Sequence, residues 1–445
     1  MSLRHTPRLG AGRLCFADPV APGTRTALWL AAVAAATVAA GLIARAAGGE
    51  LGAQLPPFFV HWDPAIDGAG LLWVALLGAT LAGAIALLRP GLSPLAFVAG
   101  AFALALVARL ALAAARDGID GWYSVFGLDP EGGNEYLPVL PALDSLGTSD
   151  FLDRFAELAP TLPIHPSAHP PGTPLLIDAL GIDGPRALAA LVIVLGACAV
   201  PLTYALGRRT GLTEERARAA AMLLALSPAA MLYGVVSTDA MFATLGLAAA
   251  CLLIGGGVVS RVLGMLALAL ASFFSWALLA IGAFATIVVA LRESLRAAAG
   301  LAIGAGIAVV GFYVALHAAT GFDPLGAIEA AGGAYDLGIS SARPYLFWLF
   351  GSPVAFAVAL GLPTAWYAAR ALGTGDAVAI GLAAIIVVSV LIGLTKAETE
   401  RIWLFMGPLA AVAAAALVPR ARMPLVLGLL GVQALAASLF LETIW

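Results

Sequence analysis

Long apolar runs separated by shorter polar segments give this chain its pattern. Alanine, leucine, valine and glycine fill repeated windows of roughly 17–25 residues, and a helix of that length crosses the hydrocarbon core of a bilayer. The runs lack the strict alternation of apolar and polar residues that is typical of a membrane β-barrel. The pattern therefore predicts an all-α polytopic membrane protein with about 13 transmembrane helices, within a range of about 11–13. The expected spans are 27–45, 69–88, 93–115, 185–206, 217–236, 239–255, 259–272, 275–291, 298–316, 344–362, 377–394, 402–418 and 424–441.

One apolar stretch, 259–291, is too long for a single span. The sequence SFFSW at 272–276 interrupts it. We expect a turn at SFFSW, which divides the stretch into two short helices.

Composition agrees with a membrane protein, because 62% of the residues are hydrophobic and only 11% are charged. Soluble proteins carry about 25% charged residues. Placing the N-terminus in the cytoplasm puts 15 of the 23 basic residues in cytoplasmic segments, as the positive-inside rule requires. The polar segments 116–183, 317–343 and 395–401 then face away from the cytoplasm, where ATP and nucleotide sugars are absent.

The longest polar segment, 116–183, is dense in carboxylates, aromatic residues and prolines. Such a loop is more typical of a folded lid over a membrane-embedded cavity than of a simple connection. Glu135, within Asn134-Glu135-Tyr136, is a candidate general base, because a carboxylate can take a hydroxyl proton as the oxygen attacks. The alternative is an ordinary solvated loop acid. The other acids of the loop that compete for this role are Asp117, Asp120, Asp129 and Glu131.

The same loop contains two short amphipathic helices, expected at 141–147 and 149–159, with Phe151, Phe155 and Leu158 on one face. They lie in the membrane interface or pack as a helical hairpin. His169-Pro170-Pro171 follows, and His169 is placed to orient a phosphate or a sugar hydroxyl. His165 and His169 also suggest a metal site, but the prolines oppose regular helical geometry between them.

Two further polar groups lie at the ends of apolar spans. Asp239 sits at the edge of hydrocarbon, where an acid is costly and indicates function, although Thr238 or Asp239 is equally an N-cap of the following helix. Arg401, in the charged hexapeptide 396–401, suits a phosphate because its guanidinium offers five donors. Lys396 and Arg343 are additional cation candidates. An ordinary interfacial loop with internally paired charges is the alternative.

Five motifs follow one another along the chain: NEYL (134–137), HPPG (169–172), YALGRR (204–209), ALSPAAMLYGVVSTDAMF (225–242) and ERIWLFMGPLAA (400–411). Together and in this order they resemble the GT-C superfamily of integral membrane glycosyltransferases. The branch with aminoarabinose transferases, protein O-mannosyltransferases and Rgt-type bacterial sugar transferases is the most similar. The resemblance covers 91–445, which leaves 1–26 as a cytoplasmic tail and 27–90 as two additional N-terminal helices.

The resemblance implies inverting transfer of a sugar from a polyprenyl-phosphate donor to a cell-envelope acceptor. Glu135 takes the place of the first-loop catalytic acid, which is often Asp in the family, and Asp239 matches a second acid. His169 stands where many members have Lys, and Arg401 would neutralise the leaving phosphate. Lys396, Arg343 and Tyr136 are expected to help bind the substrates. Family members place the key acid in the first outer loop, so Asp63 and Asp67 also compete for catalysis.

The implied surroundings are a bacterial inner (plasma) membrane, with the N-terminus cytoplasmic and the loop 116–183 extracytoplasmic. The expected partners are the lipid-linked donor, a glycan, glycolipid or protein acceptor, and membrane lipids, with no nucleic acid. No certain cofactor and no metal ligand is expected, and a divalent metal is the less favoured possibility. The alternative function is a membrane transporter or lipid flippase with a gating outer loop. Only Arg109 among the ionisable residues is expected deep within a span.

Overall fold

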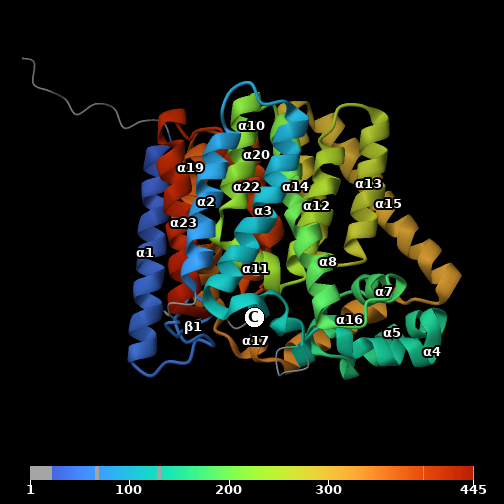
Figure 1. Ribbon diagram of the computed structural model, residues 1–445. Coiled ribbons are helices and arrows are strands. Elements are labelled where there is room, and N and C mark those ends of the chain that lie inside the picture. The colour runs from blue at the N-terminus through green and yellow to red at the C-terminus, as the bar shows by residue number, and fades with distance from the viewer. Residues whose placement is uncertain (1–22, 66–69, 128–131, 394, 444–445) are drawn as a thin grey trace, which may run out of the picture.

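The structure, a computed structural model, describes residues 23–65, 70–127, 132–393 and 395–443. The regular secondary structure of this part of the chain is helical, except for one short two-stranded sheet. Long helices stand side by side, and α1 lies at one edge of the bundle (Figure 1). The apolar helices of the bundle are α1 (Thr24–Ala46), α2 (Leu71–Leu87), α3 (Pro94–Asp117), α8 (Pro185–Ala197), α9 (Ala199–Arg209), α10 (Glu214–Ala225), α11 (Pro228–Val236), α12 (Asp239–Leu253), α13 (Val258–Ser272), α14 (Leu279–Arg292), α15 (Leu295–Thr320), α18 (Tyr345–Ala359), α19 (Leu362–Gly373), α20 (Ala377–Ile392), α22 (Gly407–Ala415) and α23 (Met423–Phe440).

Several of these helices begin where the sequence offers a capping side chain. Thr213 accepts a hydrogen bond from the third backbone N–H of its helix, and Ser294 and Asp376 do the same for α15 and α20. Such caps satisfy N–H groups that have no partner within the helix. The helix starts in these three short polar turns are therefore fixed locally.

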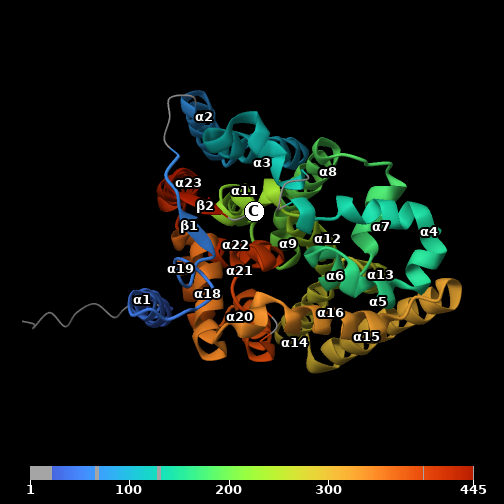
Figure 2. The same ribbon diagram turned by 90° about the horizontal axis from the view of Figure 1, so that it is seen from below.

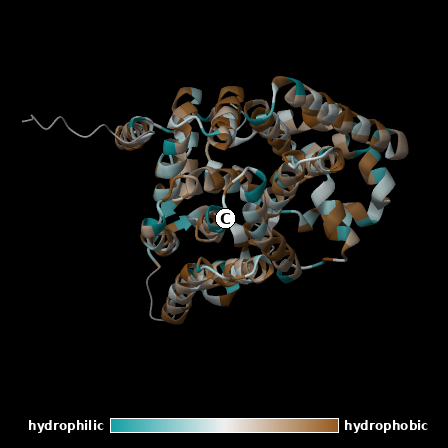
Figure 3. Cartoon of the chain, turned by 90° about the horizontal axis from the view of Figure 1, so that it is seen from above, coloured by the Kyte–Doolittle hydropathy of each residue, from teal (hydrophilic) through white to brown (hydrophobic). Residues whose placement is uncertain are grey.

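Apolar residues predominate along most helices of the bundle, which are brown in Figure 3, and many of them are exposed. On α15 the exposed residues Ile303, Ile307, Val310 and Val314 follow one another at helical spacing, each with 62–68% of its surface exposed. Water disfavours such a stripe, whereas lipid tails accommodate it. The long apolar helices indicate a multi-pass membrane protein.

Fewer helices than expected are long enough to count as spans by length and composition. Five described helices pass, or up to seven if each bent pair is one span. The expected count of about 13 is therefore not established, because other apolar helices at the expected positions are only 10–17 residues long. The two bent pairs are α10 with α11, at 54°, and α18 with α19, at 117°.

Two local expectations have different outcomes. The turn expected at SFFSW is confirmed, because α13 ends at Ser272 and a short 3-10 helix, η7 (Trp276–Leu278), leads into α14. The expected spans leave 363–376 as a connection between two helices. This is wrong, because most of the segment forms α19. Gly361, at φ 99°, makes the sharp bend before α19, a backbone conformation that favours glycine.

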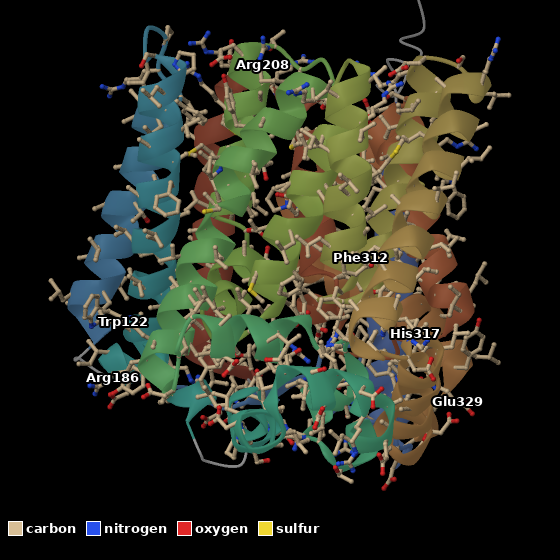
Figure 4. The ribbon with its side chains drawn as sticks, turned by 90° about the vertical axis from the view of Figure 1, so that its right-hand side faces the viewer. Trp122, Arg186, Arg208, Phe312, His317 and Glu329 are labelled. Carbon is tan, nitrogen blue, oxygen red and sulfur yellow. The ribbon has the colours of Figure 1, made fainter. Side chains whose placement is uncertain are left out.

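The polar segments gather at one end of the bundle (Figures 1 and 2). Figure 4 shows Arg208 at one end and Trp122, Arg186, His317 and Glu329 at the other. We call the latter the polar end, and it carries α4–α7, α16, α17 and α21. The three segments that the charge pattern assigned to one side thus lie together. The bounds are α4 (Leu140–Asp153), α5 (Phe155–Leu158), α6 (Ile164–Ala168), α7 (Gly172–Ala179), α16 (Pro324–Leu337), α17 (Ile339–Ala342) and α21 (Thr399–Ile402).

A second apolar core joins the polar end to the bundle. Phe151 and Phe155, expected on one face, are both buried there and pack with Phe322. The two short helices expected in this region are separated by Gly147, at φ 75°, inside the stretch named α4. The aromatic face of these helices is thus packed against the rest of the protein.

The loop between α1 and α2 pairs with the C-terminal region of the chain through two strands, β1 (Val60–Trp62) and β2 (Leu441–Thr443). These strands pair antiparallel, with His61 opposite Glu442. The loop between α1 and α2 is therefore part of the folded polar end.

Candidate functional site

Asp239 and Arg401 form a buried ion pair at the polar end. The Asp239 Oδ2 atom lies 2.9 Å from Arg401 Nη1, and the Ser237 hydroxyl donates to the same oxygen at 2.8 Å. The pair exists because α11 ends at Val236 and extended Ser237 turns the chain into α12. Thr238 is the N-cap residue, but its side chain accepts no capping hydrogen bond. The expected N-cap is therefore not formed by the Thr238 side chain. The Asp239 carboxylate binds Arg401 instead.

Glu135 faces this ion pair from the large loop. Only 2% of its surface is exposed. Burial raises the pKa of Glu135 to about 8, with Arg401 lowering it and Asp239 raising it further. These influences place Glu135, Asp239 and Arg401 in one electrostatic cluster.

A histidine lies directly beside Glu135. The Nε2 atom of His165 is 3.6 Å from Glu135 Oε1. Burial lowers the pKa of His165 well below its usual value, and Arg401 and His169 lower it further. The imidazole is therefore neutral at pH 7 and adds no charge beside the carboxyl group. Sequence patterns indicate no role for His165 beyond a metal site with His169, since 30 residues separate it from Glu135.

Tyr136 and His169 complete the wall of the cluster. The Tyr136 ring is fully buried, and its pKa is raised by burial and by Glu135 and Asp239. The His169 ring packs 5.4 Å from the Phe242 ring, measured between centroids. Burial lowers the pKa of His169 to about 4. At pH 7 His169 is a neutral hydrogen-bonding group rather than a cation.

Arg343 and Lys396 form a neighbouring cluster. The Arg343 guanidinium binds Glu398 Oε1 at 3.0 Å and the Lys396 carbonyl oxygen at 2.6 Å. The Lys396 ammonium donates to the carbonyl oxygens of Ser341 and Arg343 at 3.0 and 3.1 Å. Both cations are thus engaged by protein oxygens.

Glu398 connects the two clusters. Its Oε1 atom accepts from Arg343, and its Oε2 atom lies 3.4 Å from Arg401 Nη2. Ala397 and Glu398 both have positive φ angles, 67° and 59°. Residues other than glycine adopt this conformation at a cost, and such strain is characteristic of functional sites.

The loop between α1 and α2 supports the Glu398 turn from outside. The Phe59 N–H donates to Glu400 Oε1 at 2.9 Å, and the Phe59 ring lies 5.0 Å from the Arg343 guanidinium carbon. The Trp348 indole donates to the Leu51 carbonyl oxygen at 3.0 Å. Burial raises the pKa of Glu400 to about 7, although its own backbone N–H and that of Phe59 lower it. The additional N-terminal helices thus reach the site through their connecting loop.

The competing acids lie in other surroundings. Asp63 binds Arg116 at 2.6 Å, and Asp117 lies beside the same arginine at 3.7 Å, both with 58% of the side chain exposed. Asp120 accepts a hydrogen bond from the Tyr123 hydroxyl. Asp67, Asp129 and Glu131 lie outside the described residues. Of the acids compared, Glu135 is the buried one that faces Arg401.

Neither the search for metal ligands nor the comparison with known proteins narrows the possible functions of the site. Within the described ranges no group of three or more His, Cys, Asp or Glu side chains is arranged to hold a metal ion. Comparison with protein-family models and with curated proteins finds no match for this chain. The functional argument therefore depends on the geometry of the cluster itself.

Proposed function

We propose that the protein is an inverting glycosyltransferase that moves a sugar from a polyprenyl-phosphate donor to a cell-envelope acceptor. The observation that carries this proposal is the buried Asp239–Arg401 pair facing buried Glu135 at the polar end. A carboxyl group with a raised pKa beside a fixed guanidinium suits a reaction that takes up a proton and releases a phosphate.

The proposed step forms one bond to the anomeric carbon and breaks another. The acceptor hydroxyl oxygen attacks the anomeric carbon of the sugar while the bond from that carbon to the phosphate oxygen breaks. The attack comes from the face opposite the phosphate, so the configuration inverts. Ionised Glu135 takes the hydroxyl proton. Arg401 stabilises the charge that develops on the departing lipid phosphate.

Neighbouring residues have supporting roles in this proposal. Asp239 and Glu398 hold the Arg401 guanidinium in place from two sides. His165 lies beside Glu135 and positions its carboxyl group, and Tyr136 and His169 contact the sugar or the phosphate. Arg343 and Lys396 support the turn that presents Arg401, which differs from the direct contact with phosphate expected from the sequence.

The membrane arrangement belongs to the same proposal. The polar end faces the extracytoplasmic side of a bacterial plasma membrane, because the opposite end carries most of the arginines. The shorter apolar helices complete a bundle of about 13 spans. Residues 91–445 form the transferase core, and 27–90 are an N-terminal addition whose loop supports the site. A lipid-linked donor suits this face, where nucleotide sugars are absent.

The test is sugar transfer in reconstituted membranes. Purified protein receives a panel of radiolabelled polyprenyl-phosphate sugars with a cell-envelope extract as acceptor, and wild type is compared with Glu135→Gln and Asp239→Asn. Glu157→Gln is the matched control, since Glu157 is an exposed acid on α5 with 69% of its side chain accessible. We expect transfer from one donor that is lost in Glu135→Gln and retained in the control.

Other outcomes separate the alternatives. Transfer that survives in Glu135→Gln and is lost in Asp239→Asn moves the base to Asp239. Movement of a labelled lipid across the membrane without transfer, by folded protein, identifies a transporter or flippase and overturns the proposal.

A further inference from the structure

The end of the bundle opposite the polar end is rich in arginine, and Arg208 marks it in Figure 4. We call it the arginine end. Among the described residues its helix ends and turns carry few acids, and each acid is already engaged. Glu214 pairs with Arg218 and Arg208, Glu215 with Arg420 and Glu293 with Arg261, and Asp376 caps α20.

Six further arginines of this end therefore have no acid left to pair with. Within the described ranges none of them makes an ion pair or a side-chain hydrogen bond. A surface that carries one sign of charge attracts anions from its surroundings. The six are Arg89, Arg209, Arg216, Arg292, Arg296 and Arg422.

Two of these arginines meet at one corner of the bundle, where α9, α12 and α14 end. A Cβ atom at Gly255, in the turn after α12, would lie 2.7 Å from Arg209 Nη1. A Cβ atom at Gly211, two residues beyond Arg209, would lie 2.9 Å from Arg292 Nη2. Both guanidinium groups thus rest against turns of neighbouring helices, although both residues are exposed. We call this place the arginine corner.

Exposed aliphatic side chains border the arginine corner. Val258 and Val259 follow the Gly255 turn and begin α13, and Leu295 follows Arg292 and begins α15, each with 74–79% of its surface exposed. The helices α13 and α15 lie side by side at one edge of the bundle (Figure 1). Paired cations therefore stand at the head of two neighbouring apolar helices.

Both helices continue as apolar surfaces away from the corner. On α15 the exposed residues run from Leu295 to Val314, which corresponds to about 28 Å along the axis. One leaflet contributes only about 15 Å of hydrocarbon, so a lipid tail fits along this length. On α13 the residues with 47–55% of their surface exposed are Val262, Leu263, Leu266 and Leu270.

We propose that the arginine corner binds an anionic phospholipid, with its phosphate on Arg209 and Arg292 and its acyl chains along α13 and α15. Arginine suits this role because its planar guanidinium matches the oxygens of a phosphate. Basic sites between transmembrane helices bind anionic headgroups for the same reason. The proposal does not depend on the transfer reaction, because all of its residues lie outside the polar end.

The first test is thermal unfolding of purified protein in non-ionic detergent, titrated with phosphatidylglycerol or with phosphatidylcholine. We expect the midpoint to rise saturably with phosphatidylglycerol only. The double variant Arg209→Gln with Arg292→Gln should need about 30-fold more lipid for the same rise, the factor expected for two lost arginine contacts.

The matched control is the double variant Arg89→Gln with Arg422→Gln. It removes the same number of exposed arginines from the same end, at α2 and α23, and should respond as the wild type does. An equal loss of response in both double variants would mean that only the net charge of this end matters, and would overturn the proposal.

Two other ligands identify the source of the phosphate. Inorganic phosphate at the same concentrations should leave the midpoint unchanged, and an equal rise would replace the lipid site by a site for a free anion. Polyprenyl phosphate should act more weakly than phosphatidylglycerol. A rise with polyprenyl phosphate alone would make the donor's carrier lipid the occupant and would also overturn the proposal.

A second measurement needs no variant. Native mass spectrometry of the wild type, released from mixed micelles with equal amounts of the two phospholipids, should show one retained phosphatidylglycerol. Equal retention of both phospholipids, or of neither, would contradict a selective site.

Discussion

Arg401 and Asp239 are joined at 2.9 Å although they lie 162 residues apart in the chain, and both side chains are more than 90% buried. Removing one partner of such a pair leaves an uncompensated charge, which costs roughly 3–5 kcal/mol. The pair is therefore both a structural contact and the electrostatic centre of the candidate site.

The first prediction separates these two roles. Arg401→Gln should lower the thermal midpoint and reduce sugar transfer by about 10²–10³-fold, as loss of a transition-state donor does. The double variant Arg401→Gln with Asp239→Asn should recover most of the stability, because no buried charge is left unpaired, but no transfer. Thermal unfolding and a transfer assay on the same preparations check this. Recovery of transfer in the double variant would exclude Arg401 as the phosphate ligand.

The second prediction concerns pH. Because the pKa of Glu135 is raised to about 8, the base is protonated at neutral pH, and transfer should increase as pH rises through about 8. Asp239→Asn should move this inflection to lower pH, since the Asp239 carboxylate raises the pKa. Arg401→Gln should move residual activity to higher pH, since the guanidinium lowers the pKa. A rate–pH profile of each variant provides the measurement, and an inflection unchanged in both would mean that another group is the base.

The third prediction concerns the strained turn. Ala397 has φ 67° and is fully buried, so Ala397→Gly should preserve stability or increase it by up to about 1–2 kcal/mol. Ala397→Val should destabilise the protein, because a β-branched residue does not tolerate this conformation. Denaturation of the two variants in parallel decides the point. Equal stability of both would show that the turn is not under strain.

The fourth prediction concerns Glu400. Burial raises its folded pKa to about 7 from the usual 4.5, so its contribution to stability is fully present below about pH 4.5 and is lost as pH rises through 7. Glu400→Gln keeps a carbonyl oxygen for the Phe59 N–H and has no charge to lose. The midpoint of Glu400→Gln should therefore exceed that of the wild type increasingly between pH 5 and pH 8. A constant difference across this range would contradict the raised pKa.

The sequence predicted the apolar helices and the broken stretch at SFFSW well, because hydrophobic length and turn residues act locally. It did not predict α19, because this segment lies between two expected spans and its helix depends on the sharp bend at Gly361.

At the site, the motifs singled out Glu135, Asp239 and Arg401, which the fold brings into one cluster. The contribution of His165 and the bridging by Glu398 depend on contacts between distant segments. No local pattern encodes such contacts, and for the same reason Arg343 and Lys396 could not be distinguished from Arg401 by residue type.

The hydrogen bond from Phe59 to Glu400 has a consequence for biosynthesis. The two residues are 341 positions apart, so at about 5–20 residues per second the ribosome needs roughly 20–70 s to make the second after the first. Throughout that interval the loop after α1 has no partner at Glu400. The polar end therefore closes only when nearly all the helices have been synthesised.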